Sequence, residues 1–254
     1  MAPNLSNPTL AVDGLSKRYG KLAAVTGLTF AVEPGEILGL VGPNGAGKTS
    51  TLRCLAGVVP PTAGVIRIAG HDLARAPVPA KQALAFLPDE PKLFEYLTVV
   101  EHLNLTARLY GVAAWHSKAD HLLEELELAP QRDALPGELS RGMKQKLAIA
   151  CGFLHDPALI LLDEPLTGLD PLGIRKMKES LRRRAQSGAA LVLSSHLLPL
   201  VEELCHRVLI IARGGLVAWG TIADIRAQLG AGSAAGSLED LFLEITARTA
   251  DDGR

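Results

Sequence analysis

The sequence predicts an α/β fold with a mostly parallel central sheet, an N-terminal antiparallel β subdomain and an inserted helical subdomain. Three observations support it. Strand-like and helix-like apolar runs alternate along most of the chain. Residues 9–41 read as several short strands separated by Gly and Pro turns, and residues from about 90 to 155 read as mostly helical. We expect one large domain over residues 1–229, a flexible linker at 230–237 and a C-terminal amphipathic tail at 238–254.

Composition agrees with one large domain that has a substantial core. The chain has 254 residues and a net charge of −1, so it has no overall excess of positive charge to bind nucleic acid. No apolar run approaches the roughly 18 residues that cross a bilayer, and the first ten residues lack the basic and apolar regions of a secretory leader. We therefore expect a cytoplasmic protein. Cys54, Cys151 and Cys205 lie in helix-like apolar stretches without C-x-x-C spacing, which predicts buried, reduced thiols.

Residues 42–49, GPNGAGKT, match the phosphate-binding pattern G-x-x-x-x-G-K-[ST], and an apolar strand-like run precedes them at residues 37–41. Glycines let such a loop aim successive N–H groups at phosphates, and the following helix adds its positive dipole end. Lys48 would reach the β- and γ-phosphates and Thr49 would offer its hydroxyl to Mg²⁺. A flexible surface turn is the alternative, which the strand before and the helix after disfavour. The chain is predicted to bind a nucleoside triphosphate in a P-loop NTPase core. The predicted contacts are Gly42, Asn44, Gly45, Ala46, Gly47, Lys48, Thr49 and Ser50.

A second acidic motif ends the apolar run LILLDE at residues 159–164. Asp163 would hold Mg²⁺ directly or through water, and Glu164 would polarise the attacking water. Two acids at the end of a strand can also simply open a solvated turn. The phosphate loop upstream favours the functional interpretation.

Residues 139–150, LSRGMKQKLAIA, lie shortly before that carboxylate strand. This segment resembles the signature motif LSGGQ of the ATP-binding cassette (ABC) ATPases. Ser140 and Gly142 match the motif, while Arg141 and Met143 depart from it, as in ATPase subunits of bacterial exporters. The resemblance implies that a helix capped by Ser140 faces the γ-phosphate of ATP on an opposing subunit. An ordinary capped amphipathic helix is the alternative for this segment in isolation.

Other motifs follow in the order expected of the family, so the resemblance covers roughly residues 10–225. Tyr19 stands where an aromatic ring stacks on adenine, with a partly buried strand-end tyrosine as the alternative. Residues 166–171, LTGLDP, resemble the D-loop, in which Asp170 would contact the partner subunit's site. His196 follows the strand-like LVLSS and matches the switch histidine, which touches the γ-phosphate and helps to orient water and the catalytic carboxylate. The other six histidines are interpreted as surface or structural residues.

One family motif contains a more consequential departure. Residues 88–91, PDEP, align with the Q-loop, but Asp89 stands where glutamine contacts the Mg²⁺ region and links the core to the helical subdomain. Aspartate is one methylene shorter and carries a charge, so contact with Mg²⁺ through water and no contact both remain open. Outside the motifs, the basic residues 182–184 are interpreted as a solvated helix end.

The resemblance implies the ATPase subunit of an ABC transporter that uses ATP and Mg²⁺, and we expect an exporter, although these residues do not specify the transport direction. Two ATPase subunits, identical or different, would close on ATP and drive a separate polytopic membrane subunit from the inner face of the cell membrane. We expect no nucleic-acid partner. A soluble ABC-type ATPase acting on nucleic acid or the ribosome is the alternative, but such proteins usually carry tandem cassettes or long coiled coils. A kinase or GTPase should lack the signature helix and the strand-end histidine.

Overall fold

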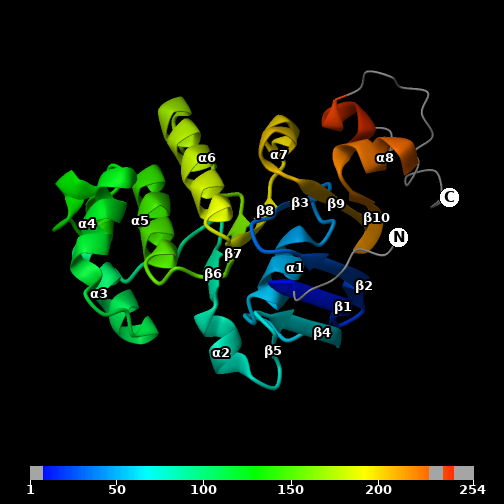
Figure 1. Cartoon of the computed structure of the whole chain (residues 1–254), viewed down its shortest axis with the longest axis horizontal. Helices are drawn as coiled ribbons and strands as arrows, with labels where there is room; N and C mark the ends of the chain where they lie inside the picture. Colours follow the sequence, from blue (N-terminus) through cyan, green and yellow to red (C-terminus); the bar gives the residue numbers. More distant parts are fainter. Residues whose placement is uncertain (1–7, 229–236, 243–254) are drawn as a thin grey trace.

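The computed structural model describes residues 8–228 and 237–242, which form two sheets and the helices that pack against them (Figure 1). One sheet is antiparallel, with strand order β2-β1-β4-β5. The other has the order β10-β9-β3-β8-β7-β6, and its strands are parallel except for β10. The predicted α/β fold, with a mostly parallel sheet beside an antiparallel one, is confirmed. The strands of the antiparallel sheet are β1 (Leu10–Tyr19), β2 (Leu22–Val32), β4 (Ala63–Ile68) and β5 (His71–Asp72).

The first part of the chain forms longer strands than the sequence indicates. Residues 10–32 form two long strands rather than several short ones. Gly14 and Gly27 both adopt positive φ where the register between β1 and β2 shifts, so these glycines bend a continuing strand instead of ending it. The strand predicted at residues 37–41 is β3 (Ile37–Val41), which belongs to the parallel sheet.

The parallel sheet forms the centre of the molecule. Its other strands are β6 (Leu84–Leu87), β7 (Leu159–Asp163), β8 (Ala190–Ser194), β9 (Arg207–Ala212) and β10 (Gly215–Gly220). Every residue of β3, β7 and β8 is buried, as expected for strands covered on both faces. Helix α1 (Lys48–Leu55) packs between the two sheets, because its buried residues Leu52, Cys54 and Leu55 share one apolar cluster with strands of both.

The helical subdomain enters the chain between the neighbouring strands β6 and β7. It contains α3 (Val99–Tyr110), α4 (Trp115–Glu125), α5 (Arg141–Phe153) and two short 3₁₀ helices, Ala129–Gln131 and Pro136–Glu138. Helix α3 begins at a capping box formed by Thr98 and Glu101 and ends at Gly111, which is left-handed. Its buried residues are Val99, His102, Leu103 and Ala107.

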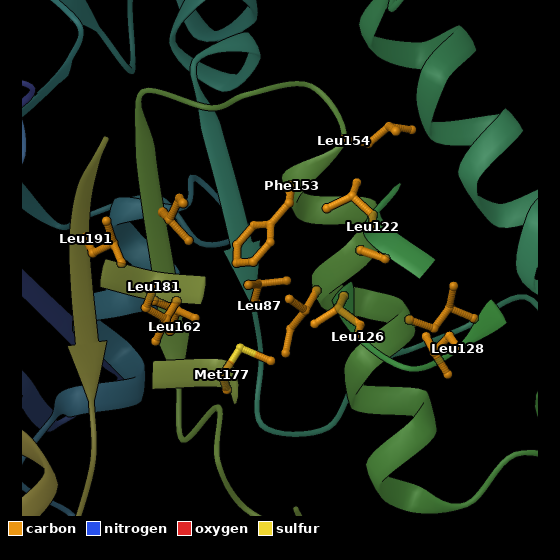
Figure 2. Close-up of a cluster of buried hydrophobic side chains, with 14 of the residues drawn as sticks. Leu87, Leu122, Leu126, Leu128, Phe153, Leu154, Leu162, Met177, Leu181 and Leu191 are labelled. Carbon is orange, nitrogen blue, oxygen red and sulfur yellow. The ribbon is translucent and has the colours of Figure 1, made fainter. Parts of the chain in front are cut away.

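The main apolar core fills the space between the parallel sheet and the helices on one of its faces (Figure 2). Strand residues such as Leu87 and Leu162 meet Phe153 of α5 and Met177 of α6 (Pro171–Gln186) there. The remaining helices are α2 (Pro77–Gln82), α7 (Leu198–Leu204) and α8 (Ile222–Gln228). Within residues 8–228 and 237–242, no helix is both long and apolar enough to cross a bilayer.

Part of the predicted tail packs on the domain. Leu238 is buried in a cluster with Val201 and Ile225, and its backbone N–H donates to Glu202 Oε2 at 3.3 Å. The predicted linker, except for Ser237, and residues 243–254 of the tail lie outside the described residues.

Candidate functional site

The phosphate loop, residues 42–49, connects the carboxyl end of β3 to α1. Gly45 and Gly47 have φ values of 79° and 104°, a region that side chains disfavour. A Cβ at Gly42 would lie 2.3 Å from the Ile211 carbonyl oxygen, and one at Gly47 would lie 2.2 Å from that of Ala24. Glycine is therefore required for the close packing of this loop as well as for its conformation.

Lys48 begins α1 and bends back over the loop. Its ammonium donates to the carbonyl oxygens of Gly42 at 2.6 Å and Pro43 at 3.2 Å. Burial lowers the pKa of this ammonium, and the negative charges of Glu164 and Asp163 act in the opposite direction. The two acids of the predicted site thus lie close enough to Lys48 to act on its charge.

The other predicted loop residues surround Lys48 in a continuous turn. Ala46 is buried and its carbonyl accepts from the backbone N–H of Gly214 at 3.0 Å, which ties the loop to the turn between β9 and β10. Asn44 and Thr49 are exposed, and Ser50 is half-buried. These side chains remain available to a ligand at the surface of the loop.

The carboxylates stand at the same edge of the sheet as the phosphate loop. Ser194 of β8 pairs with Leu40 of β3 on one side and with Asp163 of β7 on the other, and all three strands are parallel. Asp163 is 5% exposed, and its Oδ1 accepts a 2.7 Å hydrogen bond from the Ser194 hydroxyl. That bond fixes one carboxylate oxygen of Asp163.

Glu164 turns out of the sheet directly after Asp163. Its φ is 50°, a conformation that non-glycine residues seldom adopt, and its backbone N–H donates to the Ser194 carbonyl at 3.0 Å. Its Oε2 lies 2.8 Å from His196 Nδ1 and accepts from the His196 backbone N–H at 3.4 Å. The structure therefore joins the two predicted catalytic residues directly.

Ser194 is the residue of this site that the sequence interpretation missed. Its hydroxyl holds Asp163 and its carbonyl holds the Glu164 backbone. The sequence feature that could have indicated its role is a hydroxyl residue at the end of a buried apolar strand, two positions before His196. Serine is also common at the solvated ends of strands, so the pattern alone assigns it no role.

Tyr19 ends β1, and its side chain is 43% exposed. The Lys17 ammonium lies 4.9 Å from the centre of its ring. The phosphate loop is close by, since Gly47 packs on Ala24 of the adjoining strand β2. Stacking of Tyr19 on adenine stays a prediction.

The signature and D-loop residues lie together in this chain. Ser140 caps α5, and its Oγ accepts from the Met143 backbone N–H at 3.2 Å. Asp170 caps α6 in the same way, accepting from Gly173 N–H at 2.9 Å. A Cβ at Gly142 would lie 2.9 Å from the Gly168 carbonyl oxygen, so the two segments are in close contact. Both capping residues are exposed, as trans contacts would require.

Asp89 follows the carboxyl end of β6 and pairs with Arg141, whose Nη2 lies 3.5 Å from Asp89 Oδ1. The structure thus groups Lys48, Asp163, Glu164 and His196 at one edge of the sheet and directs Asp89 toward the signature segment, residues 139–143.

Residues 25–167 match the family described as ABC transporter. The chain is 37% identical to the ABC-type transporter ATP-binding protein EcsA of Bacillus subtilis, covering 93% of this chain and 96% of that protein. The chain belongs to the ABC transporter family of ATP-binding proteins. It is also 40% identical to the Nod factor export ATP-binding protein I of Paraburkholderia xenovorans, over 82% of this chain and 69% of that protein. A solved structure described as the ATP-binding subunit of an ABC transporter superposes with a TM-score of 0.89 at 38% identity, covering 94% of this chain and 99% of that one.

The family decides between the functional alternatives. This ABC ATPase binds ATP and couples its hydrolysis to transport, with a membrane partner. A soluble ATPase acting on nucleic acid or the ribosome is not favoured, because these relatives are named as transporter ATP-binding proteins. Residues 42–49 lie within the matched range, and their role as the phosphate loop stays a prediction.

Proposed function

We propose that this ABC ATPase hydrolyses Mg²⁺-bound ATP through Glu164 and His196 and thereby drives an exporter's membrane subunit. The observation that carries the proposal is the contact between Glu164 and His196, 2.8 Å apart, beside the carboxylate and the lysine of a phosphate loop. The export direction is suggested by the relative named for Nod factor export.

The residues present fit Mg²⁺. This ion prefers oxygen ligands, and the site offers the Thr49 hydroxyl and the carboxylate of Asp163. The Ser194 hydroxyl donates a hydrogen bond to Asp163 Oδ1, which leaves Asp163 Oδ2 for a metal or a metal-bound water. Bound Mg²⁺ would neutralise charge on the phosphates.

In this proposal, Glu164 acts on the attacking water. Its carboxylate accepts a proton from, or orients, the attacking water, while its left-handed backbone keeps it outside the sheet. His196 holds this carboxylate from the other side when Nδ1 carries the proton. Lys48 and the loop N–H groups stabilise the negative charge of the transferred phosphate.

A second subunit completes the site in this proposal. The exposed N-terminus of α5, capped by Ser140, presents backbone N–H groups with a positive dipole end. In a two-fold dimer it would face the γ-phosphate bound to the partner's phosphate loop. Tyr19 would stack on the adenine and Asp170 would contact the partner.

The test is the state of the Glu164→Gln variant. We expect hydrolysis to fall by about 10²- to 10⁴-fold, as for loss of a general base, with ATP still bound. The retained nucleotide should then hold two chains together, which light scattering with and without ATP would detect.

Ser140→Arg supplies the control in the same background. It places bulk at the capped N-terminus of α5 and should abolish the dimer without preventing ATP from binding the phosphate loop. A Glu164→Gln protein that binds ATP and stays monomeric at high concentration would contradict the sandwich arrangement for identical subunits. Where a second, different ATPase subunit exists, adding it to the Glu164→Gln protein tests whether the two form a heterodimer.

The membrane subunit would dock where the helical subdomain meets the parallel sheet. A cavity of about 400 Å³ opens there between β6, α3 and α5. Phe94 and Leu109 on its lining are 61% and 71% exposed, and Tyr96 nearby is 88% exposed. Large exposed apolar side chains around a groove are typical of protein interaction sites. This docking would hold the ATPase at the cytoplasmic face of the membrane.

A further inference from the structure

Two residues that depart from the family's motifs contact each other in this chain. Asp89 replaces the Q-loop glutamine, and Arg141 is the basic departure in the signature segment. They are separated along the sequence by all of α3 and α4. In space, Arg141 Nη2 lies 3.5 Å from Asp89 Oδ1.

Asp89 Oδ1 depends on this partner. The atom is shielded from solvent, and among the described residues no donor forms a hydrogen bond with it. A shielded carboxylate oxygen without a donor is costly, and the guanidinium is the positive charge that offsets it. The rest of the pair is open to water, since the Arg141 and Asp89 side chains are 62% and 44% exposed.

The stem of Arg141 also lies beside the D-loop, at Gly168. A Cβ at Gly168 would lie 3.4 Å from Arg141 Cδ, and Gly168 has a φ of 81°. The next residue, Gly142, packs against the Gly168 carbonyl. Arg141 therefore spans from the D-loop turn before α6 to the Q-loop segment after β6.

We propose that Asp89 and Arg141 form a positioning pair that holds the signature segment against the core of its own subunit. Asp89 then acts through Arg141 rather than as a metal ligand. Glutamine and glycine cannot form an ion pair, so the two departures compensate each other. The inference deepens the proposed function and rests on it for the role of the signature segment.

A double-mutant cycle tests the pair. Asp89→Asn, Arg141→Gln and the double variant remove the charges one at a time and together. We expect each single variant to lower kcat for ATP by about two- to five-fold with an unchanged KM, the size of effect that a partly exposed ion pair supports. The double variant should be no worse than either single variant, because each change already breaks the same contact.

A second readout needs no nucleotide. Hydrogen exchange of the backbone amides in the first turn of α5 should quicken by a similar factor in all three variants of the nucleotide-free protein. The matched control is the same cycle at Arg175 and Glu179, an exposed pair 3.2 Å apart along α6, which should leave both readouts unchanged.

Additive effects on kcat would overturn the pairing. So would an Asp89→Asn change that raises the Mg²⁺ requirement equally in the presence and absence of Arg141→Gln, since that result makes Asp89 a metal ligand. Failure of the proposed function appears differently, as a wild-type protein without ATPase activity whose α5 exchange still responds to the cycle.

Discussion

Lys48 is a residue on which burial and charge act in opposite directions. Burial lowers the pKa of its ammonium, while Glu164 and Asp163 favour the charged form. The carbonyls of Gly42 and Pro43 hold it in the loop. A lysine kept in place by the backbone of its own loop is preorganised for phosphate oxygens.

Replacing Lys48 with Ala removes that charge. We expect ATP affinity to fall by about 10- to 100-fold, the range for a charged hydrogen bond, and kcat to fall by about 10²- to 10³-fold. Calorimetry with ATP and a phosphate-release assay measure the two quantities. Lys21→Ala changes an exposed lysine outside the loop and should affect neither. Unchanged turnover in Lys48→Ala would remove the phosphate loop from the mechanism.

Sequence patterns were informative for residues whose chemistry requires a fixed spacing. The phosphate loop and the adjoining acids could be located because glycine, lysine and carboxylate positions follow from how phosphates are held. Ser194 and the contact between Asp89 and Arg141 could not, because they depend on strand pairing and on segments that meet only in the folded chain. The structure brings Lys48, Asp163, Glu164 and His196 together, but their roles stay predictions, as do those of Tyr19, Ser140 and Asp170, since each involves a nucleotide, a metal or a partner.

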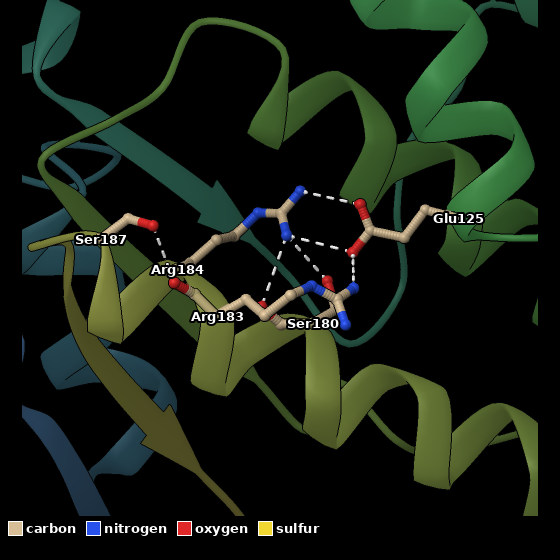
Figure 3. Close-up of polar contacts among 5 residues, drawn as sticks. All are labelled: Glu125, Ser180, Arg183, Arg184 and Ser187. Carbon is tan, nitrogen blue, oxygen red and sulfur yellow. Dashed lines mark hydrogen bonds and ion pairs between the residues drawn. The ribbon is translucent and has the colours of Figure 1, made fainter.

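At the scale of elements, α4 of the helical subdomain contacts α6 of the core through a cluster of charged and polar side chains (Figure 3). Glu125 accepts from Arg183 at 2.6 Å and from both Nη atoms of Arg184 at 3.2 and 3.3 Å. Arg184 also bonds Ser180 Oγ at 2.9 Å, and its guanidinium lies 3.7 Å from the Phe153 ring centre. The interpretation of residues 182–184 as a solvated helix end is therefore wrong for Arg184, because the sequence does not show which residues α4 brings to it.

Glu125 makes the stabilisation from this contact between α4 and α6 depend on pH. Burial raises its pKa, but hydrogen bonds from Ser180, Arg184 and Arg183, together with the charge of Arg184, outweigh burial and lower it from 4.5 to about 2. A folded-state pKa below the unfolded value means that the ionised group stabilises the fold above about pH 4.5. That stabilisation is lost as the pH falls from about 4.5 through about 2.

Glu125→Gln should therefore lower the free energy of unfolding at pH 7 by about 1 to 2 kcal/mol, with solvent screening taken into account. The difference from wild type should shrink steadily below about pH 4.5. Urea unfolding at several pH values measures it. Glu179→Gln, which breaks an exposed pair on α6, is the control and should change stability by less than about 0.5 kcal/mol. A pH-independent deficit in Glu125→Gln would assign the effect to packing instead.

Elements defined by local sequence patterns could be predicted better than elements that depend on pairing between distant segments. The helical insertion could be recognised from periodicity, because α3 and α5 each carry a regular apolar face. The antiparallel sheet was only partly predictable. Strands β4 and β5, which complete it, follow α1 and join β1 across a long sequence separation. No local pattern reports such a pairing.

At the scale of the whole molecule, the carboxyl edge of the parallel sheet connects the phosphate site to the helical subdomain. Strands β3, β8, β7 and β6 are neighbours in that order, and they lead from the phosphate loop through His196 and Glu164 to Asp89. Asp89 then contacts Arg141 at the start of α5. In the proposed mechanism, a change at the nucleotide would reach α5 by this route, and α5 borders the apolar groove proposed for the membrane subunit.

The groove gives the last prediction. The tagged chain, purified gently from detergent extracts, should retain a polytopic membrane protein. Leu109→Glu places a charge on the groove lining, where the native side chain is 71% exposed, and should reduce the recovered membrane protein by at least about tenfold because a buried unpaired charge opposes docking. Folding and basal ATPase activity should be unchanged, since Leu109 lies outside the nucleotide site.

Leu216→Glu supplies the matched control. Leu216 is an exposed leucine of β10, at the far edge of the sheet from β6, so the same change in charge and size should leave the complex intact. Equal loss in both variants would show that added charge alone disrupts the complex, and no loss in Leu109→Glu would place the docking surface elsewhere. Recovery of ribosomes or nucleic acid with no membrane protein would instead favour the soluble ATPase that acts on nucleic acid or the ribosome. The apolar groove would then serve a different kind of contact.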